Sequence, residues 1–150
     1  MDDHCYIDFS FSHLNIFLRI QKLFHYIKER KKDVIQTENF DDDIQLLDFF
    51  TEEELNYFWW PTEQENEEFW DIYIKLPKEK RLEHLTSVPW DYATVFGEIG
   101  VGDYEITDCK MISNDKGRVY YYPIGFPYGG NEPLQEAIKV FGAKITAVRG

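Results

Sequence analysis

The chain opens with an alternating pattern of apolar and polar residues and then changes to a helical period. Residues 5–11 follow a period of two, which predicts a strand. Its apolar face consists of Cys5, Ile7, Phe9 and Phe11. Ser12 is then expected to cap a helix. The apolar positions of that helix recur at helical spacing and are Ile16, Ile20, Leu23, Phe24 and Ile27. Basic side chains gather at its end, residues 28–32, where cations complement the helix dipole.

Capping signals predict three short helices in the middle of the chain. Asp41 or Asp42 is expected to cap a helix that carries Ile44, Leu47 and Phe50. Two Thr-x-x-Glu sequences, 51–54 and 62–65, have the form of a capping box and predict two further helix starts. The inward-facing residues of these two helices are expected to be Leu55, Phe58, Trp59, Phe69, Ile72, Tyr73 and Leu76.

From Pro77 onward the pattern moves from helical to extended. Pro77 begins or breaks a piece whose buried side is expected to be Leu82 and Leu85. Residues 92–96 have the composition of a strand, and Gly97, Gly100 and Gly102 predict a loop after it. Residues 104–112 and 118–122 predict two strands joined by a turn at 113–117.

The last thirty residues predict a loop, a helix and a strand. Residues 123–130 are rich in proline, glycine and aromatic residues, which is typical of a rigid loop. Asn131 is expected to cap a helix that turns Leu134, Ala137, Ile138 and Phe141 inward and ends at Gly142. Residues 144–148 predict the final strand. The chain is therefore expected to form one α+β domain, residues 1–150. Helices lie mainly in its N-terminal half, and an antiparallel sheet with one helix packed on it forms the C-terminal half. The strand order stays open.

Residues 33–74, the acidic aromatic segment, account for the whole net charge of −12. They contain 14 acids and no lysine or arginine, against 14 acids and 16 bases in the rest of the chain. Their aromatic residues are Phe40, Phe49, Phe50, Tyr57, Phe58, Trp59, Trp60, Phe69, Trp70 and Tyr73. An acidic surface disfavours nucleic acids and anionic membranes as direct partners and favours a basic protein.

Composition also bears on disulfides, membrane insertion and secretion. Cys5 and Cys109 are too few for a disulfide framework, no apolar run is long enough to span a membrane, and the N-terminus lacks the basic region of a secretory signal. We therefore expect a cytoplasmic protein with reduced cysteines. No histidine lies in a recognisable Cys/His setting, so no catalytic residue and no cofactor are predicted.

Two other groups of residues have features of a ligand site. The carboxylates of Asp41, Asp42 and Asp43 lack the spacing of a calcium-binding loop, so they are expected to cap a helix and no metal site is predicted. Gly129 and Gly130 precede a helix N-terminus, where an anion could bind. Glu132 beside them favours tight packing of the loop instead.

Adjacent aromatic residues in the acidic aromatic segment must point to different sides of a helix. We therefore expect Phe58, Trp59 and Phe69 to be buried and Trp60 and Trp70 to be partly exposed. Exposed tryptophans among carboxylates are typical of a binding surface for a basic protein. The predicted partner-binding residues are Asp41, Asp42, Asp43, Glu52, Glu53, Trp60, Glu63, Glu67, Glu68 and Trp70.

In size, charge and general character, the whole chain resembles the immunity proteins of bacterial toxin–immunity systems, including those of contact-dependent inhibition. The resemblance implies an inhibitor that binds a basic toxin domain, frequently a nuclease, and it transfers no site residues. Two alternatives stay open. One is a DNA-mimicking regulator of a nucleic-acid-binding protein. The other is a small enzyme with a carboxylate acid/base pair in a cleft near Trp90 and residues 120–122.

Overall fold

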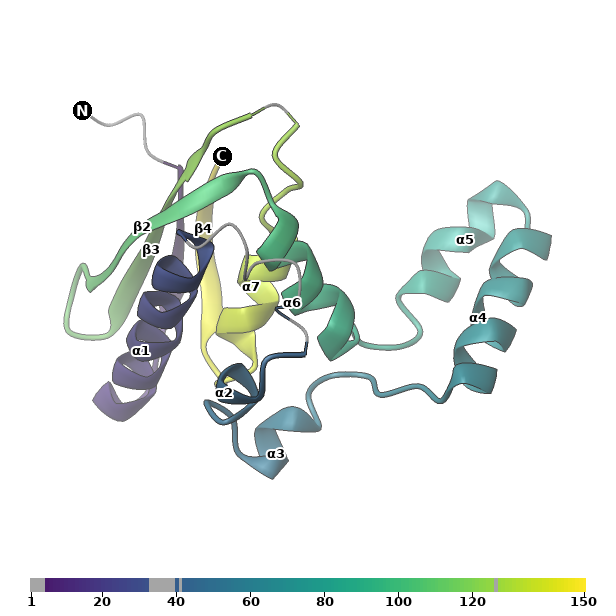
Figure 1. Cartoon of the computed structure of the whole chain (residues 1–150), viewed down its shortest axis with the longest axis horizontal. Helices are drawn as coiled ribbons and strands as arrows, with labels where there is room; N and C mark the ends of the chain where they lie inside the picture. Colours follow the sequence, from purple (N-terminus) through teal and green to yellow (C-terminus); the bar gives the residue numbers. More distant parts are fainter. Residues whose placement is uncertain (1–4, 33–39, 41, 126) are drawn as a thin grey trace.

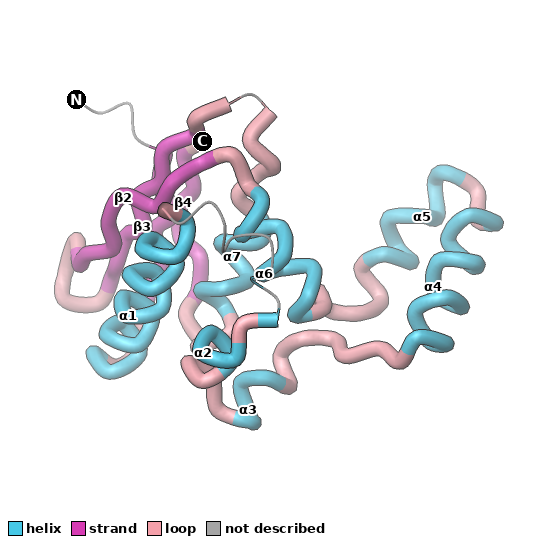
Figure 2. The backbone as a smooth tube through the Cα atoms, in the orientation of Figure 1, coloured by secondary structure: helices cyan, strands magenta, loops and turns pink. Residues whose placement is uncertain are grey.

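One antiparallel sheet and seven helices make up the part of the chain that the computed structural model describes, residues 5–32, 40, 42–125 and 127–150 (Figures 1 and 2). The helices are α1 (Leu14–Lys31), α2 (Ile44–Leu47), α3 (Glu52–Leu55), α4 (Glu63–Lys75), α5 (Lys78–Leu85), α6 (Tyr92–Val101) and α7 (Glu132–Lys139). The strands are β1 (Cys5–Ser10), β2 (Tyr104–Met111), β3 (Lys116–Pro123) and β4 (Lys144–Arg149). The α+β class expected from the sequence is confirmed.

The sheet has the order β2-β3-β1-β4, and all of its neighbours are antiparallel. The N-terminal strand β1 therefore lies inside the sheet, between the β2–β3 hairpin and the C-terminal strand. Ile7 pairs with Val119 of β3 on one side and with Val148 of β4 on the other. A central position for the first strand ties the two ends of the described chain into one core.

Helices α1 and α7 pack on the same face of the sheet. Phe9 of β1 stacks on Phe17 of α1, with ring centroids 6.2 Å apart and an interplanar angle of 16°. Tyr121 pairs with Cys5 in the register and so shares the face of Phe9. Its hydroxyl accepts a hydrogen bond from Nδ2 of Asn131, the residue before α7, at 3.1 Å. The fully buried part of the core consists of Ile7, Phe9, Ile20, Leu23, Phe24, Ile27, Phe40, Leu46, Val95, Phe96, Ile99, Val119, Tyr121, Leu134, Ala137 and Ile138.

The opposite face of the sheet carries a charged pair. Nε and Nη2 of Arg118 donate to the two carboxylate oxygens of Asp8, at 2.5 and 2.9 Å. The guanidinium lies 3.8 Å from the ring centroid of Tyr6. Asp8 and Arg118 are opposite one another in the β1–β3 register. This cross-strand pair satisfies a carboxylate that is nearly buried.

The basic end of α1 does more than complement its own helix dipole. Nζ of Lys31 donates to the backbone carbonyls of Ile99 and Gly102, at 2.6 and 3.0 Å. These carbonyls belong to the C-terminal turn of α6, where helix carbonyls have no partner within the helix. The ammonium also lies 4.5 Å from the ring centroid of Tyr104. Lys31 therefore joins α1 to the end of α6.

The strand expected at residues 92–96 is wrong, because this stretch begins helix α6. Asp91 caps the helix and accepts a hydrogen bond from the backbone N–H of Thr94 at 2.9 Å. The buried residues Tyr92, Val95, Phe96, Ile99 and Gly100 follow helical spacing. Residues 97 and 100, expected to form a loop, are helical as well. Tertiary burial of one face overrides the strand propensity of the β-branched and aromatic residues.

Several predicted helix ends are shifted. Helices α2 and α3 end at Leu47 and Leu55, so Phe50, Phe58 and Trp59, which were expected on these helices, lie in the segments that follow them. Helix α1 is preceded by His13, without a side-chain cap, and not by Ser12. Helix α2 is capped by Asp43, whose carboxylate accepts from the N–H groups of Gln45 and Leu46. Neither Asp41, which lies outside the described residues, nor Asp42 is the cap. Gly142 was expected directly after the last residue that caps α7. The helix ends at Lys139 with Val140 as its C-cap, one residue earlier than this requires, so the left-handed Gly142, with φ of 90°, lies two residues after the cap.

Candidate partner-binding surface

Helices α4 and α5 form a hairpin that projects from the body of the molecule (Figure 1). We call this hairpin, residues 62–86, the arm. The capping box at its start is confirmed, because the Thr62 hydroxyl accepts from Glu65 N–H at 3.1 Å and the Glu65 carboxylate accepts from Thr62 N–H at 3.0 Å. These hydrogen bonds lower the pKa of Glu65. Pro77 caps α5, so the chain turns between Leu76 and Lys78.

The two segments that lead into and out of the arm are paired. The backbone N–H of Trp59 donates to the carbonyl of Trp90 at 2.9 Å, and Trp59 forms a parallel bridge with Asp91. We call this pairing the stem, because it holds together the two ends of the segment 60–89, which contains the arm. The two segments are therefore joined to one another where the arm leaves the body.

The arm has a very small interior of its own. Phe69 is the one residue among 62–86 that is buried. Its ring stacks on the imidazole of His84 with centroids 4.2 Å apart, and its carbonyl lies 2.8 Å from Nε2 of His84. The indole of Trp59 lies 5.2 Å from the Phe69 ring on the stem side. One phenyl ring thus joins α4, α5 and the stem.

Apolar side chains of the arm are exposed to an unusual degree. Ile72, Leu82 and Leu85, which the sequence pattern assigned to buried faces, are exposed, and Leu82 reaches 70%. Trp70 is 45% exposed, as expected, and Ile74 is exposed too. The prediction failed for the three aliphatic residues because α4 and α5 pack on one another and not on the sheet. Their apolar faces therefore have no second layer to cover them.

Acidic side chains predominate in α4, and the basic side chains of the arm lie near the turn between α4 and α5. The acids of α4 are Glu63, Glu65, Glu67, Glu68 and Asp71, and they are exposed. The bases lie around the turn and are Lys75, Lys78, Lys80 and Arg81. Arg81 closes the end of α4 by donating to the carbonyls of Leu76 and Ile74, each at 3.2 Å. Among the described residues, no lysine or arginine forms an ion pair with an acid of α4, so these carboxylates stay available.

The structure distributes the predicted partner-binding residues over three places. Asp42 and Asp43 precede α2, and Glu52 and Glu53 lie in the first turn of α3. Asp41 lies outside the described residues. The largest group is on the arm or beside its stem and consists of Trp60, Glu63, Glu67, Glu68 and Trp70. Glu63, Glu67 and Trp70 are spaced i, i+4 and i+7, which places them on one face of α4.

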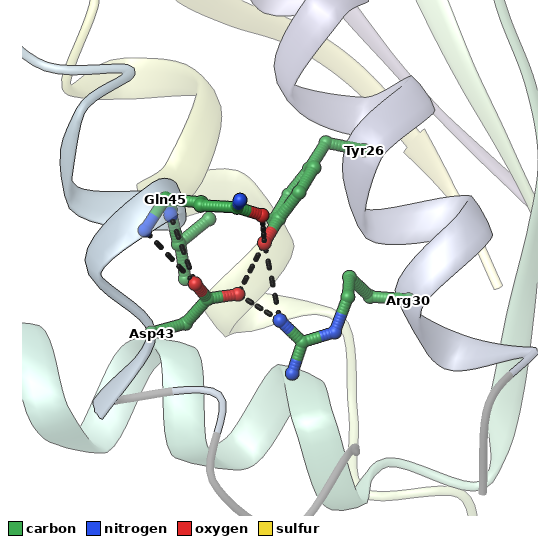
Figure 3. Close-up of polar contacts among 5 residues, drawn as sticks. Tyr26, Arg30, Asp43 and Gln45 are labelled. Atoms are coloured by element: carbon green, nitrogen blue, oxygen red, sulfur yellow. Dashed lines mark hydrogen bonds and ion pairs between the residues drawn. The ribbon is translucent and has the colours of Figure 1, made fainter.

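Asp43 is occupied by contacts within the chain (Figure 3). Besides capping α2, its carboxylate forms an ion pair with Arg30 and accepts a hydrogen bond from the hydroxyl of Tyr26. Arg30 also donates to that hydroxyl at 3.1 Å, and Gln45 accepts from it at 3.3 Å. These contacts join α2 to α1. Asp43 therefore has a structural role without any partner.

Trp60 is exposed on one side and held on the other. Its ring stacks on Tyr92 of α6, with centroids 5.1 Å apart and an interplanar angle of 17°. Its indole N–H donates to the carbonyl of Leu55 at 2.8 Å. The side chain is 52% exposed. A rigid tryptophan with one free face is a suitable anchor for a partner, since little conformational entropy is lost on binding.

A cavity of about 320 Å³ lies in the angle between the arm and α6, and we call it the stem pocket. It is lined by Trp59, Pro61, Thr62, Glu63, Asn66, Trp70, Asp91 and Thr94. Of the residues that the sequence analysis selected, the pocket brings together Glu63 and Trp70. It adds Trp59, Asp91 and Thr94, which the sequence pattern did not indicate as binding residues. An Asp-x-x-Thr sequence before α6 would have signalled a helix cap here, but not a pocket wall.

Trp90 and residues 120–122, considered above as the place of an acid/base pair, lie in different elements. Trp90 belongs to the stem, whereas residues 120–122 lie in β3, and these elements are far apart in Figure 1. The Cys109 thiol is buried in β2, and burial raises its pKa to about 12. A thiol with such a pKa is a poor nucleophile near neutral pH.

No arrangement for metal or anion binding stands out in the described parts of the chain. Within them, no group of three or more histidine, cysteine, aspartate or glutamate side chains could hold a metal ion. At the start of α7, an oxygen of Glu132 lies 2.5 Å from where a Cβ on Gly130 would be. The Glu132 carboxylate thus lies against Gly130 and brings negative charge to this helix start, which disfavours an anion there. No described helix is long and apolar enough to cross a membrane.

Comparisons of the chain with protein-family models, with curated proteins and with solved structures gave no match.

Proposed function

We propose that this protein binds and neutralises a basic protein, in the manner of an immunity protein that inhibits a bacterial toxin. The arm is the main recognition element. The observation that carries the proposal is the exposure of Trp70 beside the unpaired carboxylates of Glu63 and Glu67 on a hairpin that projects from the body.

Electrostatics supports a basic partner. The net charge is −12, and the arm presents five acids on one helix without internal ion pairs. Opposite charge on a partner accelerates the encounter, and carboxylates at the rim of an interface select against acidic competitors. Association is therefore expected to be fast at low salt and to slow as salt screens the charges.

The aromatic and aliphatic side chains of the arm support tight binding after encounter. Tryptophan is enriched among the residues that dominate binding energy at protein interfaces. Trp60 and Trp70 are held by hydrogen bonds of their indole N–H groups, to Leu55 at 2.8 Å and Asn66 at 3.2 Å. Ile74 and Leu82 add exposed apolar area that a partner could cover.

Affinity capture from the native host tests the proposal, with washes at low and at high salt. The informative variant is Glu67→Lys/Glu68→Lys on the arm. Its matched control is Glu98→Lys/Glu105→Lys, which makes the same charge change at exposed positions of the body. A basic partner should be retained by the wild type and the control. The arm variant should bind it about tenfold more weakly or worse at low salt.

Neutralisation is measured by co-expression with the captured partner. The partner should be toxic when expressed alone, and growth should be restored by the wild type and the body control but not by the arm variant. A partner that binds equally well at all salt concentrations and to both variants contradicts the proposal. If DNA displaces the partner, the protein belongs instead with DNA-mimicking regulators.

A further inference from the structure

The stem pocket combines two tryptophans with two carboxylates. We propose that it receives an arginine side chain of the basic partner, an inference that rests on the proposed function and names the group recognised. The arginine would enter between the arm and α6, with its guanidinium against Trp59 and Trp70 and its N–H groups directed to Glu63 and Asp91.

The aromatic walls of the pocket are held in place by a shared neighbour. Phe69 lies 5.2 Å from the ring of Trp59 and 5.1 Å from the ring of Trp70, the latter at 90°. The Trp70 indole N–H is fixed further by its hydrogen bond to Oδ1 of Asn66 at 3.2 Å. Tryptophan is the best aromatic partner for a cation, and a planar guanidinium stacks on it as well.

The polar side of the pocket carries negative charge that the chain leaves uncompensated. None of its eight lining residues is basic. Neither Glu63 nor Asp91 forms an ion pair within the described parts of the chain. Oδ2 of Asp91 accepts hydrogen bonds from the N–H and the hydroxyl of Thr94, both at 2.9 Å. These bonds orient the carboxylate, and Oδ1 can accept from a bound ligand. Arginine provides five N–H donors in a fixed fork that suits two carboxylates.

The size of the cavity favours one side chain over a larger ligand. Its volume of about 320 Å³ is at the lower limit of pockets that hold small molecules. Its position at the foot of the arm also matters. A partner that contacts the exposed face of α4 would place its own surface directly over the opening, since Glu63 and Trp70 belong to both.

The test uses a small probe and the full-length protein without any partner. N-acetyl-arginine amide is titrated into the 15N-labelled protein, and the four indole N–H resonances are followed by NMR after assignment with Trp→Phe variants. N-acetyl-citrulline amide, which has nearly the same shape but no charge, is the matched control. The arginine probe should shift the Trp59 and Trp70 resonances saturably and bind about tenfold more tightly than citrulline, while Trp60 stays unaffected.

Three variants complete the experiment. Glu63→Gln should weaken binding of the arginine probe by about threefold to tenfold, and Trp70→Ala should abolish saturation, whereas Trp60→Ala should bind like the wild type. Equal binding of the two probes, or an unchanged affinity in Glu63→Gln, overturns the inference. Failure of the proposed function would give a different result from failure of the pocket inference. In that case no toxic partner is neutralised, although the pocket still binds arginine. If instead the partner binds Asp91→Asn, which alters the pocket and not the exposed face of α4, as it binds the wild type and still binds the Glu67→Lys/Glu68→Lys arm variant more weakly, the pocket inference fails alone.

Discussion

Arg19 of α1 holds Glu54 of α3 through two hydrogen bonds, Nη1 to Oε2 at 2.5 Å and Nη2 to Oε1 at 2.6 Å. The same glutamate completes the capping box of α3, because its Oε1 accepts from the N–H of Thr51 at 2.9 Å. Burial opposes ionisation of Glu54, but Arg19 and Thr51 outweigh it, and the pKa lies below its usual value. The charge of Glu54, one acid of the acidic aromatic segment, is thereby paired with a base of α1.

Replacing Glu54 by alanine should lower the free energy of unfolding by about 2 kcal/mol, since it removes both a helix cap and a partly buried ion pair. Glu52→Ala is the matched control, because Glu52 lies in the same helix turn but is exposed. It should change stability by less than about 0.5 kcal/mol. Urea unfolding measures both values, and equal effects would contradict the assigned role of Glu54.

Replacing Phe69 by alanine should loosen the arm without unfolding the body. Phe69 is the buried centre of the arm, whereas the core under the sheet is built from other residues. Amide hydrogen exchange should therefore lose protection in residues 62–86 and keep it in β1 and β3. Leu134→Ala, at a fully buried site in α7, is the contrasting variant and should cost about 3 kcal/mol of global stability. Loss of protection throughout Phe69→Ala would show that the arm is part of the main cooperative unit.

Lys31 should make stability rise with pH above neutrality. Burial lowers its pKa in the folded protein to about 8 from an ordinary 10.5, with Asp103 partly opposing the shift. Between these values the unfolded chain binds more protons at this group, so its contribution to the free energy of unfolding increases with pH. Allowing for solvent screening, we expect about 1–2 kcal/mol over the whole interval.

The Lys31 effect must be separated from that of Cys109, which has the opposite sign. The raised pKa of Cys109 means that the unfolded thiol ionises first, so stability falls as pH rises past about 8.5. Burial also raises the pKa of Tyr57, Tyr104 and Tyr121, and these groups lower stability as the pH approaches 10. Urea unfolding of Cys109→Ala from pH 8 to about pH 9 should therefore show the increase from Lys31. Adding Lys31→Met should remove the slope. A slope that survives this second substitution belongs to another group.

The two thiols should react at very different rates. Cys5 is half-buried at the start of β1, whereas Cys109 is buried with a pKa raised to about 12. With a disulfide reagent at pH 8, one thiol should react quickly and the other more than about a hundredfold more slowly, because the thiolate is the reacting species. Cys5→Ser should remove the fast phase and Cys109→Ser the slow one. Unfolding in urea should make both rates similar.

The sequence predicted the elements whose signals are local. The capping boxes at Thr51 and Thr62 are present, because their hydrogen bonds join groups three residues apart. The alternation in residues 5–11 gave a strand and the spacing in α1 gave its buried face, since each pattern follows from backbone geometry alone. The exposure of Trp70 was also predictable, because adjacent side chains on a helix point to different sides. Trp60 is exposed as expected but for another reason, since α3 ends at Leu55 and Trp60 follows the bridge that Trp59 forms with Asp91.

What the sequence determined by itself is therefore the α+β class, most element positions and the concentration of acid in residues 33–74. Only the tertiary structure decided the strand order, the pairing of Asp43 and Glu54 with arginines of α1, and the projection of α4 and α5 as an arm. The stem pocket belongs to the second group, since it joins Trp59 and Glu63 to Asp91 across the whole arm. The physical reason is the range of the contacts. Caps and periodic faces depend on neighbours within one or two turns, whereas burial, ion pairing and pockets depend on residues that only folding brings together.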